Sequence, residues 1–523
     1  MKNSVGLKGF CSKSVLTMIV IHLLRICNNG IHGFVSRAPP LIERRFQKDA
    51  RPYALTSLSM VSKTADEKIR SSTNVDDDVL PRILLKRNRQ TKNFRDGSQL
   101  IFSGSIAKTP ASLRMGDLVQ VEVPSVKNSD ANSNVPNTVV GWGLYNPSSL
   151  YRVRIILHSL LHPEMKDEFS VLSSEFGKEG ESKILERILT MNFQRCFQTR
   201  RALGLPLDSK TDTFRLVNGE GDSVSGLAVD VVGGDVAVIM SSAAWCEIHK
   251  STILESLRKT LPEHELIWKT TPARLKQDGY TLDDENDDVY SATEIDEPVI
   301  CLENGIKYRT HPRQKGQKTS VYCDQRNNRL DLAQLCVGKR VLDLCCYHGG
   351  FSLNAANQGA KFAIGVDSSG DAVDTCKGNA ELNKFDEETV RFVKSDITDY
   401  MRNCEEKFDV VVLDPPKLAP SVKALQRASR KYHSLNRDAI KLIGDEGGLL
   451  MTCTCSAAMT QKDGGKYFLE MVQQASLSAQ REVTLLRVSG AAPCHTQSPF
   501  SFPAGNYLTA ALFMVHPIKS KYN

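Results

Sequence analysis

Apolar runs that end in acidic residues recur along the C-terminal half of the chain. Between Arg340 and Asp367, an apolar run closing in Asp343 is followed by a tight turn, a helical pattern over Phe351–Asn357 and a second apolar run, Phe362–Val366. This succession predicts a strand, a helix and a strand, and therefore a βαβ unit in a parallel sheet. Further runs continue the alternation at 391–396, 408–414 and 448–456. The sequence thus predicts an α/β domain.

Polar side chains follow these predicted strands. Because parallel strands end at one edge of a sheet, where open α/β sheets bind ligands, we expect these side chains to form a site. The turn Cys345–Gly350 is neither G-x-G-x-x-G nor a P-loop, and Asp367 follows its glycines by about 20 residues, a spacing suited to a ribose diol. The spacing resembles the S-adenosylmethionine (AdoMet) site of class I methyltransferases. A βαβ unit without any ligand is the simpler alternative. The side chains concerned are those of Asp343, Asp367, Asp396, Asp414, Cys453 and Cys455.

The preceding part of the chain has the strand runs and turn residues of two smaller units. Strand runs at 100–104, 116–123 and 139–147 predict a small β-barrel domain over residues 80–158. A helical pattern over Ile184–Leu203 and a strand at Val236–Met240 predict a central α/β domain over residues 183–310. Within it, residues 278–297 contain nine acids and no base, which indicates a disordered surface insertion.

Residues 1–62 resemble a targeting leader rather than a domain. They hold nine Lys or Arg and two acids, so they account for the whole net charge of +7. A short apolar core over Val15–Leu24 fits a signal peptide, and the basic, acid-poor stretch from Gly33 fits a transit peptide. We expect a plastid location, with the mitochondrion as the alternative, and no membrane segment in the mature form. A frayed N-terminus is the plain alternative. Residues 63–79 have the polar, acidic composition of a linker.

The fourteen cysteines are scattered along the chain, without a C-x-x-C pair or a His/Cys cluster at zinc spacing. We therefore expect reduced thiols, no disulfide framework and no metal site.

Two basic segments are candidates for contact with RNA phosphates. The first, Pro81–Arg95, holds six bases and no acid beside the predicted barrel. The second lies on a helix expected after Asp414, where bases recur at i, i+4 and i+7 or i+8 on one face. A solvated surface is the alternative for both. The candidate RNA-binding residues are Arg82, Lys86, Arg87, Arg89, Lys423, Arg427 and Arg430, or Lys431 in place of the last.

Two turns place reactive groups after neighbouring strands, D-P-P-K at Asp414–Lys417 and T-C-S at Thr454–Ser456. A thiolate beside a methyl donor suggests covalent catalysis on a pyrimidine, because addition to C6 makes C5 nucleophilic. Asp414 is suited to hold the N3/N4 edge of cytosine, and Lys417 to lower the pKa of the thiol. Lys417 also stands where amino-group methyltransferases carry a stacking aromatic residue, which argues against a reaction at adenine N6.

Together these motifs make the chain similar to the rRNA large-subunit methyltransferase I family, from about Arg82 to Val515. The shared elements are F-S-G, G-L-Y-N-P, R-L-V-N-G-E-G-D, G-Q-K-T with D-Q-R-N-N-R, L-D-P-P-K, C-S and F-P-A-G-N-Y-L. The resemblance implies a PUA-like RNA-binding domain, a central domain, and a C-terminal Rossmann-like class I methyltransferase domain over residues 311–519. It further implies AdoMet-dependent 5-methylcytidine formation in large-subunit rRNA, with Cys455 as nucleophile. The expected cofactor-binding residues are Asp343, Cys345, Tyr347, Gly349, Asp367, Ser368, Asp396 and Asp414.

Departures from the family pattern keep alternatives open. The turn Cys345–His348 is poor in glycine, unlike the usual AdoMet turn. Lys417 stands where two-cysteine RNA methyltransferases carry a second thiol. The base that removes the C5 proton is therefore unassigned. Cys453 lies two residues from Cys455 and competes for the nucleophilic role. We expect free or partly assembled large-subunit rRNA as partner and leave a homodimer open. The alternatives are a guanine-directed or tRNA methyltransferase, and a non-catalytic ribosome-assembly factor that binds RNA.

Overall fold

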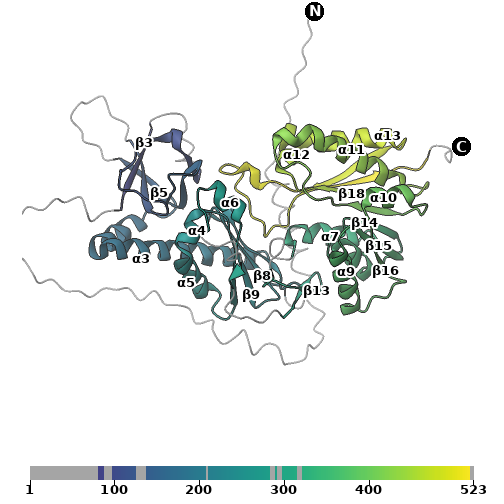
Figure 1. Cartoon of the computed structure of the whole chain (residues 1–523), viewed down its shortest axis with the longest axis horizontal. Helices are drawn as coiled ribbons and strands as arrows, with labels where there is room; N and C mark the ends of the chain where they lie inside the picture. Colours follow the sequence, from purple (N-terminus) through teal and green to yellow (C-terminus); the bar gives the residue numbers. More distant parts are fainter. Residues whose placement is uncertain are drawn as a thin grey trace, which may run out of the picture. The chain divides into compact units, whose positions relative to one another are not determined.

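The C-terminal domain is built on a seven-stranded sheet of order β16-β15-β14-β17-β18-β20-β19. The computed structural model describes residues 80–86, 97–124, 137–207, 210–282, 289–290, 297–314 and 321–518 (Figure 1). The first five strands in that order run parallel, and β20 pairs antiparallel with both of its neighbours. The strands are β14 (Arg340–Leu344), β15 (Phe362–Asp367), β16 (Val390–Lys394), β17 (Val410–Leu413), β18 (Gly448–Thr454), β19 (Val483–Ser489) and β20 (Thr509–Val515).

Helices cover both faces of this sheet, because its buried strands carry apolar residues on alternate sides. Val341 packs in the core shared with helices α7, α8 and α9, whereas the adjacent Leu342 packs in the core shared with α10, α11 and α13. Figure 1 shows α11, α12 and α13 above β18, and α7 and α9 beside the strands β14, β15 and β16. The helices are α7 (Arg326–Ala333), α8 (Gly350–Asn357), α9 (Gly370–Leu382), α10 (Ile397–Asn403), α11 (Leu425–Lys441), α12 (Ala457–Gln461) and α13 (Lys466–Ser478). The Rossmann-like prediction is confirmed.

The N-terminal domain is a six-stranded sheet of order β2-β6-β5-β4-β1-β3. Its own core gathers apolar residues from five strands, including Ile83, Ile101, Val121 and Val153. The strands are β1 (Arg82–Leu85), β2 (Leu100–Phe102), β3 (Ile106–Lys108), β4 (Leu118–Val123), β5 (Thr138–Tyr145) and β6 (Tyr151–His158).

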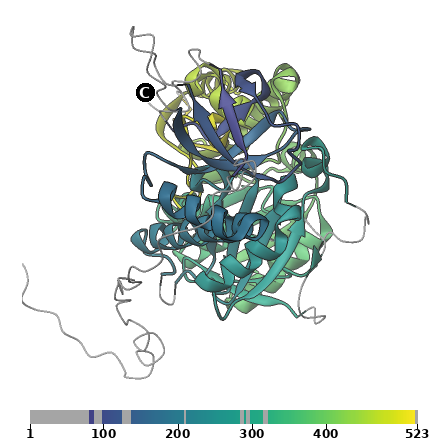
Figure 2. The same cartoon turned by 90° about the vertical axis from the view of Figure 1, so that its left-hand side faces the viewer.

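The central domain packs a five-stranded sheet, β11-β10-β9-β8-β7, against helix α3. Trp142 of β5 meets Phe169 of α3 edge to face, with ring centroids 4.9 Å apart, so this helix also belongs to the core next to the N-terminal domain (Figures 1 and 2). The elements are α3 (Met165–Ala202), β7 (Phe214–Asn218), β8 (Leu227–Val232), β9 (Val236–Ser241), α4 (Ala244–Ile248), α5 (Lys250–Thr260), β10 (Glu265–Thr270), α6 (Pro272–Gln277) and β11 (Val289–Tyr290), followed by the hairpin of β12 (Val299–Glu303) and β13 (Ile306–Thr310).

Two expectations about the central domain need correction. Helix α3 begins at Met165, not near Ile184, because the charged, Ser and Gly residues of its first half hide the apolar period in the sequence. The acidic insertion begins with an ordered residue. Asp278 is buried, and it accepts hydrogen bonds from Arg154 Nη2 (2.8 Å), Asn146 Nδ2 (3.2 Å) and the Ala244 backbone N–H (2.9 Å). Its carboxylate thereby joins the N-terminal and central domains, which charge density alone does not reveal.

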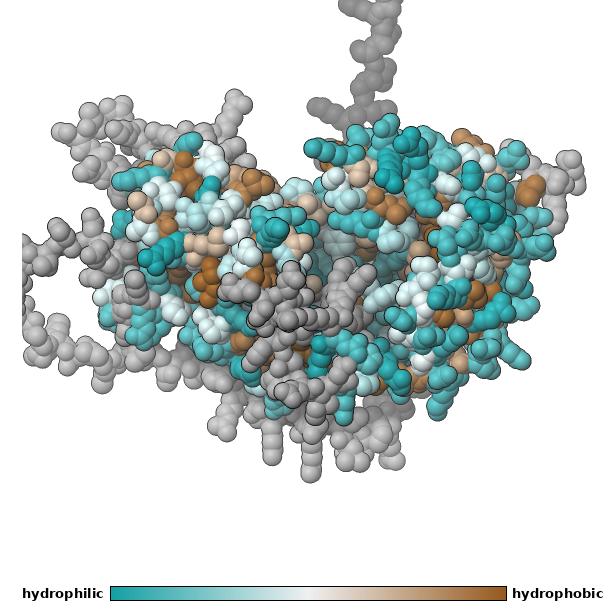
Figure 3. Space-filling view, in the orientation of Figure 1, coloured by the Kyte–Doolittle hydropathy of each residue, from teal (hydrophilic) through white to brown (hydrophobic). Residues whose placement is uncertain are grey.

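The expected leader, linker and most of the acidic insertion lie outside the described residues. Among the residues that are described, no helix combines the length and the apolar character of a membrane span. On the face shown in Figure 3, hydrophilic residues cover most of the C-terminal domain, and the apolar ones are scattered.

Candidate functional site

The predicted edge of the sheet forms where the strand order reverses, between β14 and β17. From β14 the chain continues to β15 on one side of this point, and from β17 it continues to β18 on the other side. The crevice beyond the carboxyl ends of the strands at such a point is the usual ligand site of these folds. Asp343, Asp367, Asp414 and Cys455 lie at the carboxyl ends of four of these strands. The structure therefore brings the main predicted residues to one edge.

Asp343 is a buried carboxylate with one unused oxygen. Its Oδ2 accepts hydrogen bonds from the Ser352 backbone N–H (3.0 Å) and hydroxyl (2.8 Å). Its Oδ1 has no hydrogen-bond partner among the described residues, and burial raises the pKa of the carboxyl to about 6. A buried acceptor without a donor is costly unless a ligand satisfies it. The ammonium group of AdoMet is a donor of the right charge, so the site fits this cofactor.

Asp367 organises the turn that follows β14. Its Oδ2 accepts from the Tyr347 backbone N–H and its Oδ1 from that of Ser369, both at 3.0 Å. A carboxylate offers about four acceptor positions, so two remain for a ribose diol. Ser368, also predicted to touch the cofactor, is exposed beside it.

The turn takes left-handed backbone angles without a full set of glycines. Cys345 has φ = 65°, Tyr347 has φ = 51° and Gly349 has φ = 82°. Left-handed angles at non-glycine residues persist where the surroundings hold them. Here the His348 ring is buried and stacks on Tyr308, with centroids 4.9 Å apart, and burial lowers the pKa of His348 well below its ordinary value. The glycine-poor turn is therefore a packed element.

The two glycines of this turn allow close packing within the domain. A Cβ on Gly349 would lie 3.0 Å from Cζ of Phe392, and a Cβ on Gly350 would lie 2.5 Å from Nε of Arg329. They allow helix α8 to pack closely on these two side chains.

Asp396 has a local structural role in addition to any ligand role. It is exposed, and its Oδ1 accepts from the backbone N–H groups of Thr398 (2.7 Å) and Asp399 (3.3 Å), which caps the N-terminus of α10. These hydrogen bonds lower the pKa of Asp396.

The two reactive turns meet after β17 and β18. The Ser456 hydroxyl donates a hydrogen bond to the Ala419 carbonyl, which ties the T-C-S turn to the loop that follows D-P-P-K. Cys455 is half-buried just past the end of β18, whereas Cys453 is fully buried within the strand. Burial raises the pKa of the Cys453 thiol well above its ordinary value. Of the two thiols, Cys455 is the one with access to a substrate.

Asp414 is a half-buried carboxyl at the same edge. Burial, and next the charge of Asp324, raise its pKa to about 7. Its Oδ2 accepts a hydrogen bond from Gln325 Nε2 at 3.0 Å. At neutral pH this group can thus both donate and accept a proton.

Two site residues carried no assigned role in the sequence, Tyr322 and Gln325. The Tyr322 ring meets Tyr347 edge to face, with centroids 4.9 Å apart. Burial raises the pKa of Tyr322, and the nearby Cys455 and Asp414 raise it further. Both residues lie in or beside the D-Q-R-N-N-R element, which is the signal that could have identified them.

The candidate RNA-binding residues divide into three groups. Arg82 lies in β1, and its Nε is 3.7 Å from Glu122 Oε1, so it is not part of an acid-free surface. Lys86 is exposed at the end of this strand, whereas Arg87 and Arg89 lie outside the described residues. The remaining three are exposed on the segment after the D-P-P-K turn: Lys423, Arg427 and Arg430.

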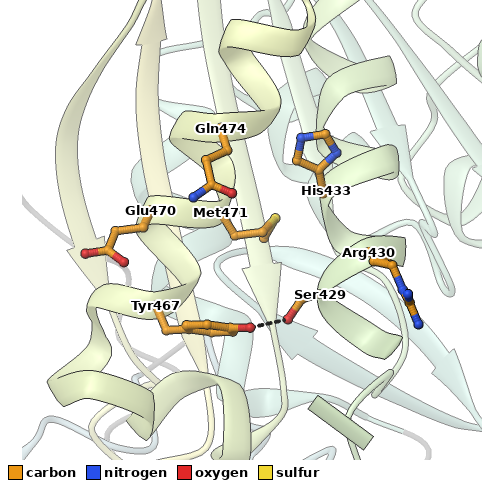
Figure 4. A pocket seen from close by; sticks show the side chains of 7 residues that line it. All are labelled: Ser429, Arg430, His433, Tyr467, Glu470, Met471 and Gln474. Carbon is orange, nitrogen blue, oxygen red and sulfur yellow. Dashed lines mark hydrogen bonds between the residues drawn. The ribbon is translucent and has the colours of Figure 1, made fainter. Parts of the chain in front are cut away.

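An open groove of about 360 Å³ lies beside these bases, between α11 and α13. Figure 4 shows His433 and Arg430 on α11, Met471 between the two helices, and the Ser429 and Tyr467 hydroxyls in contact at 2.9 Å. Lys431, the alternative to Arg430, donates a hydrogen bond to the Thr398 hydroxyl. Arg430 is therefore the more available of the two.

Two family models match separate parts of the chain. Residues 83–157 match the PUA-like domain family, and residues 328–473 match the family described as conserved hypothetical protein 95. Two solved structures share the fold over the whole of their own length. One is a protein assigned as a methyltransferase and solved with SAH (TM-score 0.62, 21% identity, 84% of this chain), and the other is a protein from Streptococcus mutans assigned as a SAM-dependent methyltransferase (TM-score 0.61, 20% identity, 83% of this chain).

Curated relatives are more similar in sequence. The ribosomal RNA large subunit methyltransferase I of Aeromonas hydrophila is 37% identical over 56% of this chain and 72% of its own length. The protein of the same name from Klebsiella pneumoniae is 29% identical over 83% of this chain and 98% of its own length. The chain thus belongs to the ribosomal RNA large subunit methyltransferase I family.

Proposed function

We propose that this protein methylates C5 of a cytosine in large-subunit rRNA, with Cys455 as a covalent nucleophile. The observation that carries the proposal is that a half-buried thiol, Cys455, and a half-buried carboxyl, Asp414, follow the neighbouring parallel strands β18 and β17 at one edge of the sheet. Methylation at carbon needs a nucleophile that activates the ring, whereas methylation at an amino group does not. The names of the relatives direct the proposal to large-subunit rRNA.

The proposed reaction begins when the Cys455 thiolate forms a bond to C6. The electron pair of the C5–C6 double bond moves into the ring, while Asp414 gives its proton to N3 and accepts a hydrogen bond from the N4 amino group. Bound AdoMet supplies the sulfonium methyl group that the activated C5 takes. The C5 proton then leaves to a base, the C5–C6 double bond re-forms, the bond to Cys455 breaks, and Asp414 recovers its proton.

The proposed cofactor contacts come from the ends of two neighbouring strands, β14 and β15. Asp343 Oδ1 would receive the ammonium group, Asp367 the ribose diol, and the turn Cys345–Gly349 would lie against the methionine part. Each of these groups is an acceptor or a fixed backbone segment that is in place without the ligand.

The proposed RNA contact is the exposed basic face formed by Lys423, Arg427 and Arg430. It begins directly after the D-P-P-K turn, so phosphates bound there would lie next to the reacting base. No ion-pair partner for these three side chains occurs in the part of the chain that the structure describes. Cations without such partners are free to neutralise phosphates.

We further propose that residues 1–62 direct the protein to a plastid. The support is compositional: an apolar core followed by a basic, acid-poor segment. A fluorescent protein fused to residues 1–62 should enter plastids. Entry into mitochondria instead would replace the proposal with its alternative.

The deciding experiment combines tritiated AdoMet with undermethylated bacterial-type 23S rRNA. Wild type is compared with C455A and with C404A, which removes another half-buried thiol away from the sheet edge. Label in 5-methylcytidine that is lost only in C455A would support the reaction and the nucleophile. Label in another base would discard the cytosine mechanism. Absence of label despite AdoMet binding would redirect the search to tRNA or an assembled particle.

A further inference from the structure

The D-Q-R-N-N-R element has no part in the reaction described so far, although it lies under the reactive edge. It spans the short helical turn Cys323–Gln325 and the first residues of α7. The side chains of Asp324, Gln325 and Asn328 are at most 6% exposed, which is unusual for polar groups. Buried polar groups of this kind are kept where their hydrogen bonds serve a purpose.

Gln325 reaches the reactive carboxyl directly. Its Nε2 donates to Asp414 Oδ2 at 3.0 Å, and its Oε1 accepts from Asn328 Nδ2 at 2.7 Å. Asn328 Nδ2 also donates to the Gly490 carbonyl at 3.1 Å. A carbonyl can only accept, so the Asn328 amino group must face Gly490 and Gln325 Oε1. The Gln325 amino group must then face Asp414. These three hydrogen bonds therefore allow only one orientation of the Asn328 amide and one of the Gln325 amide.

A second distant element supports the same place. The Tyr507 hydroxyl, in F-P-A-G-N-Y-L, donates to Asp324 Oδ2 at 2.7 Å, and the Ala492 backbone N–H donates to the Asp324 carbonyl at 2.7 Å. The segment between β19 and β20 is thus fastened to the residue next to Gln325. Two motifs far apart in the sequence meet beneath Asp414.

We propose that Gln325, held in one orientation by Asn328 and the Gly490 carbonyl, is a positioning residue that turns Asp414 toward the target base. The proposal rests on the function proposed above and deepens it. The hydrogen bond from Gln325 to Oδ2 restricts rotation of the Asp414 carboxyl group. A carboxyl that must meet two neighbouring groups on a base, N3 and N4, gains from a fixed plane.

Several charged or titratable groups act on Asp414 besides Gln325. The Asp324 and Asp343 carboxyls raise its pKa, whereas Arg329 and the Gln325 hydrogen bond lower it. Loss of that hydrogen bond should therefore raise the pKa of Asp414 further. The other titratable neighbours are Tyr322, Cys345, Tyr432, Cys453 and Cys455.

The test uses the full chain and three variants. Q325L removes the hydrogen bond to Asp414. N328D replaces the donor that faces Gln325 Oε1 with an acceptor. It therefore favours rotation of the Gln325 amide, which would turn Oε1 instead of Nε2 toward Asp414, although residue 328 itself does not contact Asp414. Q325E restores the contact only when its carboxyl is protonated. Q334L, an exposed change at the end of the same helix, is the matched control.

We expect Q325L and N328D to lower kcat by about 10- to 100-fold with an unchanged KM for AdoMet. The alkaline limb of the pH profile should move upward by about one unit in Q325L. Q325E should approach wild-type activity at low pH only, and Q334L should match wild type throughout. A kcat loss without any movement of the pH limb, or an equal loss in Q334L, would show that α7 acts only as scaffold and would overturn the proposal.

A second readout does not depend on the reaction. Thermal midpoints at pH 8 are compared for wild type, Q325L, D414N and the double variant. We expect Q325L to cost several degrees in wild type and clearly less in the D414N background, because the hydrogen bond to the carboxylate is already gone. Additive shifts would contradict the coupling. If wild type places no methyl group on cytosine, the proposed function fails, and this cycle still decides whether Gln325 acts on Asp414.

Discussion

Cys453 and Cys455 stand two residues apart, yet only the second can meet a substrate. Cys453 points into the core between the sheet and helices α7 to α9, where it is fully buried, whereas Cys455 lies past the last residue of β18 and is half-buried. The strand ends at Thr454, so the alternation that would have placed both thiols on one side stops between them. The structure thereby separates two thiols that the strand pattern alone placed on one side.

This separation predicts the outcome of a covalent trap. RNA that carries 5-fluorocytidine at the target position should form a stable adduct with wild type and with C453A, because fluorine blocks the loss of the C5 substituent. C455A should form none and should lose at least about 10³-fold in kcat/KM. Denaturing electrophoresis of labelled RNA measures the adduct, with C404A as control. An adduct that survives in C455A but not in C453A would reverse the assignment.

The raised pKa of Asp414 predicts that this residue weakens the fold at neutral pH. Its folded-state pKa of about 7 exceeds the ordinary 3.8, so the folded chain holds the extra proton between these values. Stability from this group is full at low pH and is lost as pH rises through about 7. D414N should therefore be more stable than wild type at pH 8, by about 1–3 kcal/mol, and by little near pH 4. Urea unfolding at both pH values measures the difference, and an equal effect at both would refute it.

The basic face predicts a salt-dependent RNA affinity. Reversal of Lys423, Arg427 and Arg430 to Glu should weaken rRNA binding at least about tenfold at 0.1 M salt and flatten its dependence on salt by about one unit of slope per lost phosphate contact. Filter binding over a salt series measures both. Reversal of the exposed Lys361, Lys377 and Lys441 changes the net charge equally and should have a smaller effect. Equal losses in the two variants would mean that only net charge matters.

The orphaned oxygen of Asp343 predicts a pH-dependent cofactor affinity. D343N should weaken the binding of AdoMet and of SAH by about 10- to 100-fold, the value of a hydrogen bond between charged groups. In wild type, affinity should fall as pH drops through about 6, because protonation removes the charge that faces the ammonium group. Isothermal titration with SAH measures both effects, with the exposed D371N as control. A pH-independent affinity would exclude this role.

Much of the C-terminal domain follows from local pattern. Apolar runs, the acids that close them and the glycines between them were sufficient to predict strands β14 to β18 and helix α8 within a few residues. Strands β19 and β20 were not predicted, since β19 is largely exposed and its apolar residues alternate poorly. The prediction for helix α3 was too short for a related reason. A helix that is stabilised by contacts with two domains needs little amphipathic pattern of its own.

The class of the fold, the carboxyl edge with the candidate site and the residues suited to chemistry could be predicted from the sequence, because side-chain period and strand-end position are local properties. The contacts of each candidate residue depend on the tertiary structure. It set Cys455 apart from Cys453, left Asp343 Oδ1 without a donor, assigned Asp396 to a helix cap and buried Asp278 between domains. It also brought Gln325 to Asp414, which lies 89 residues away in the chain. Such contacts depend on how separate elements pack, and no local pattern encodes that.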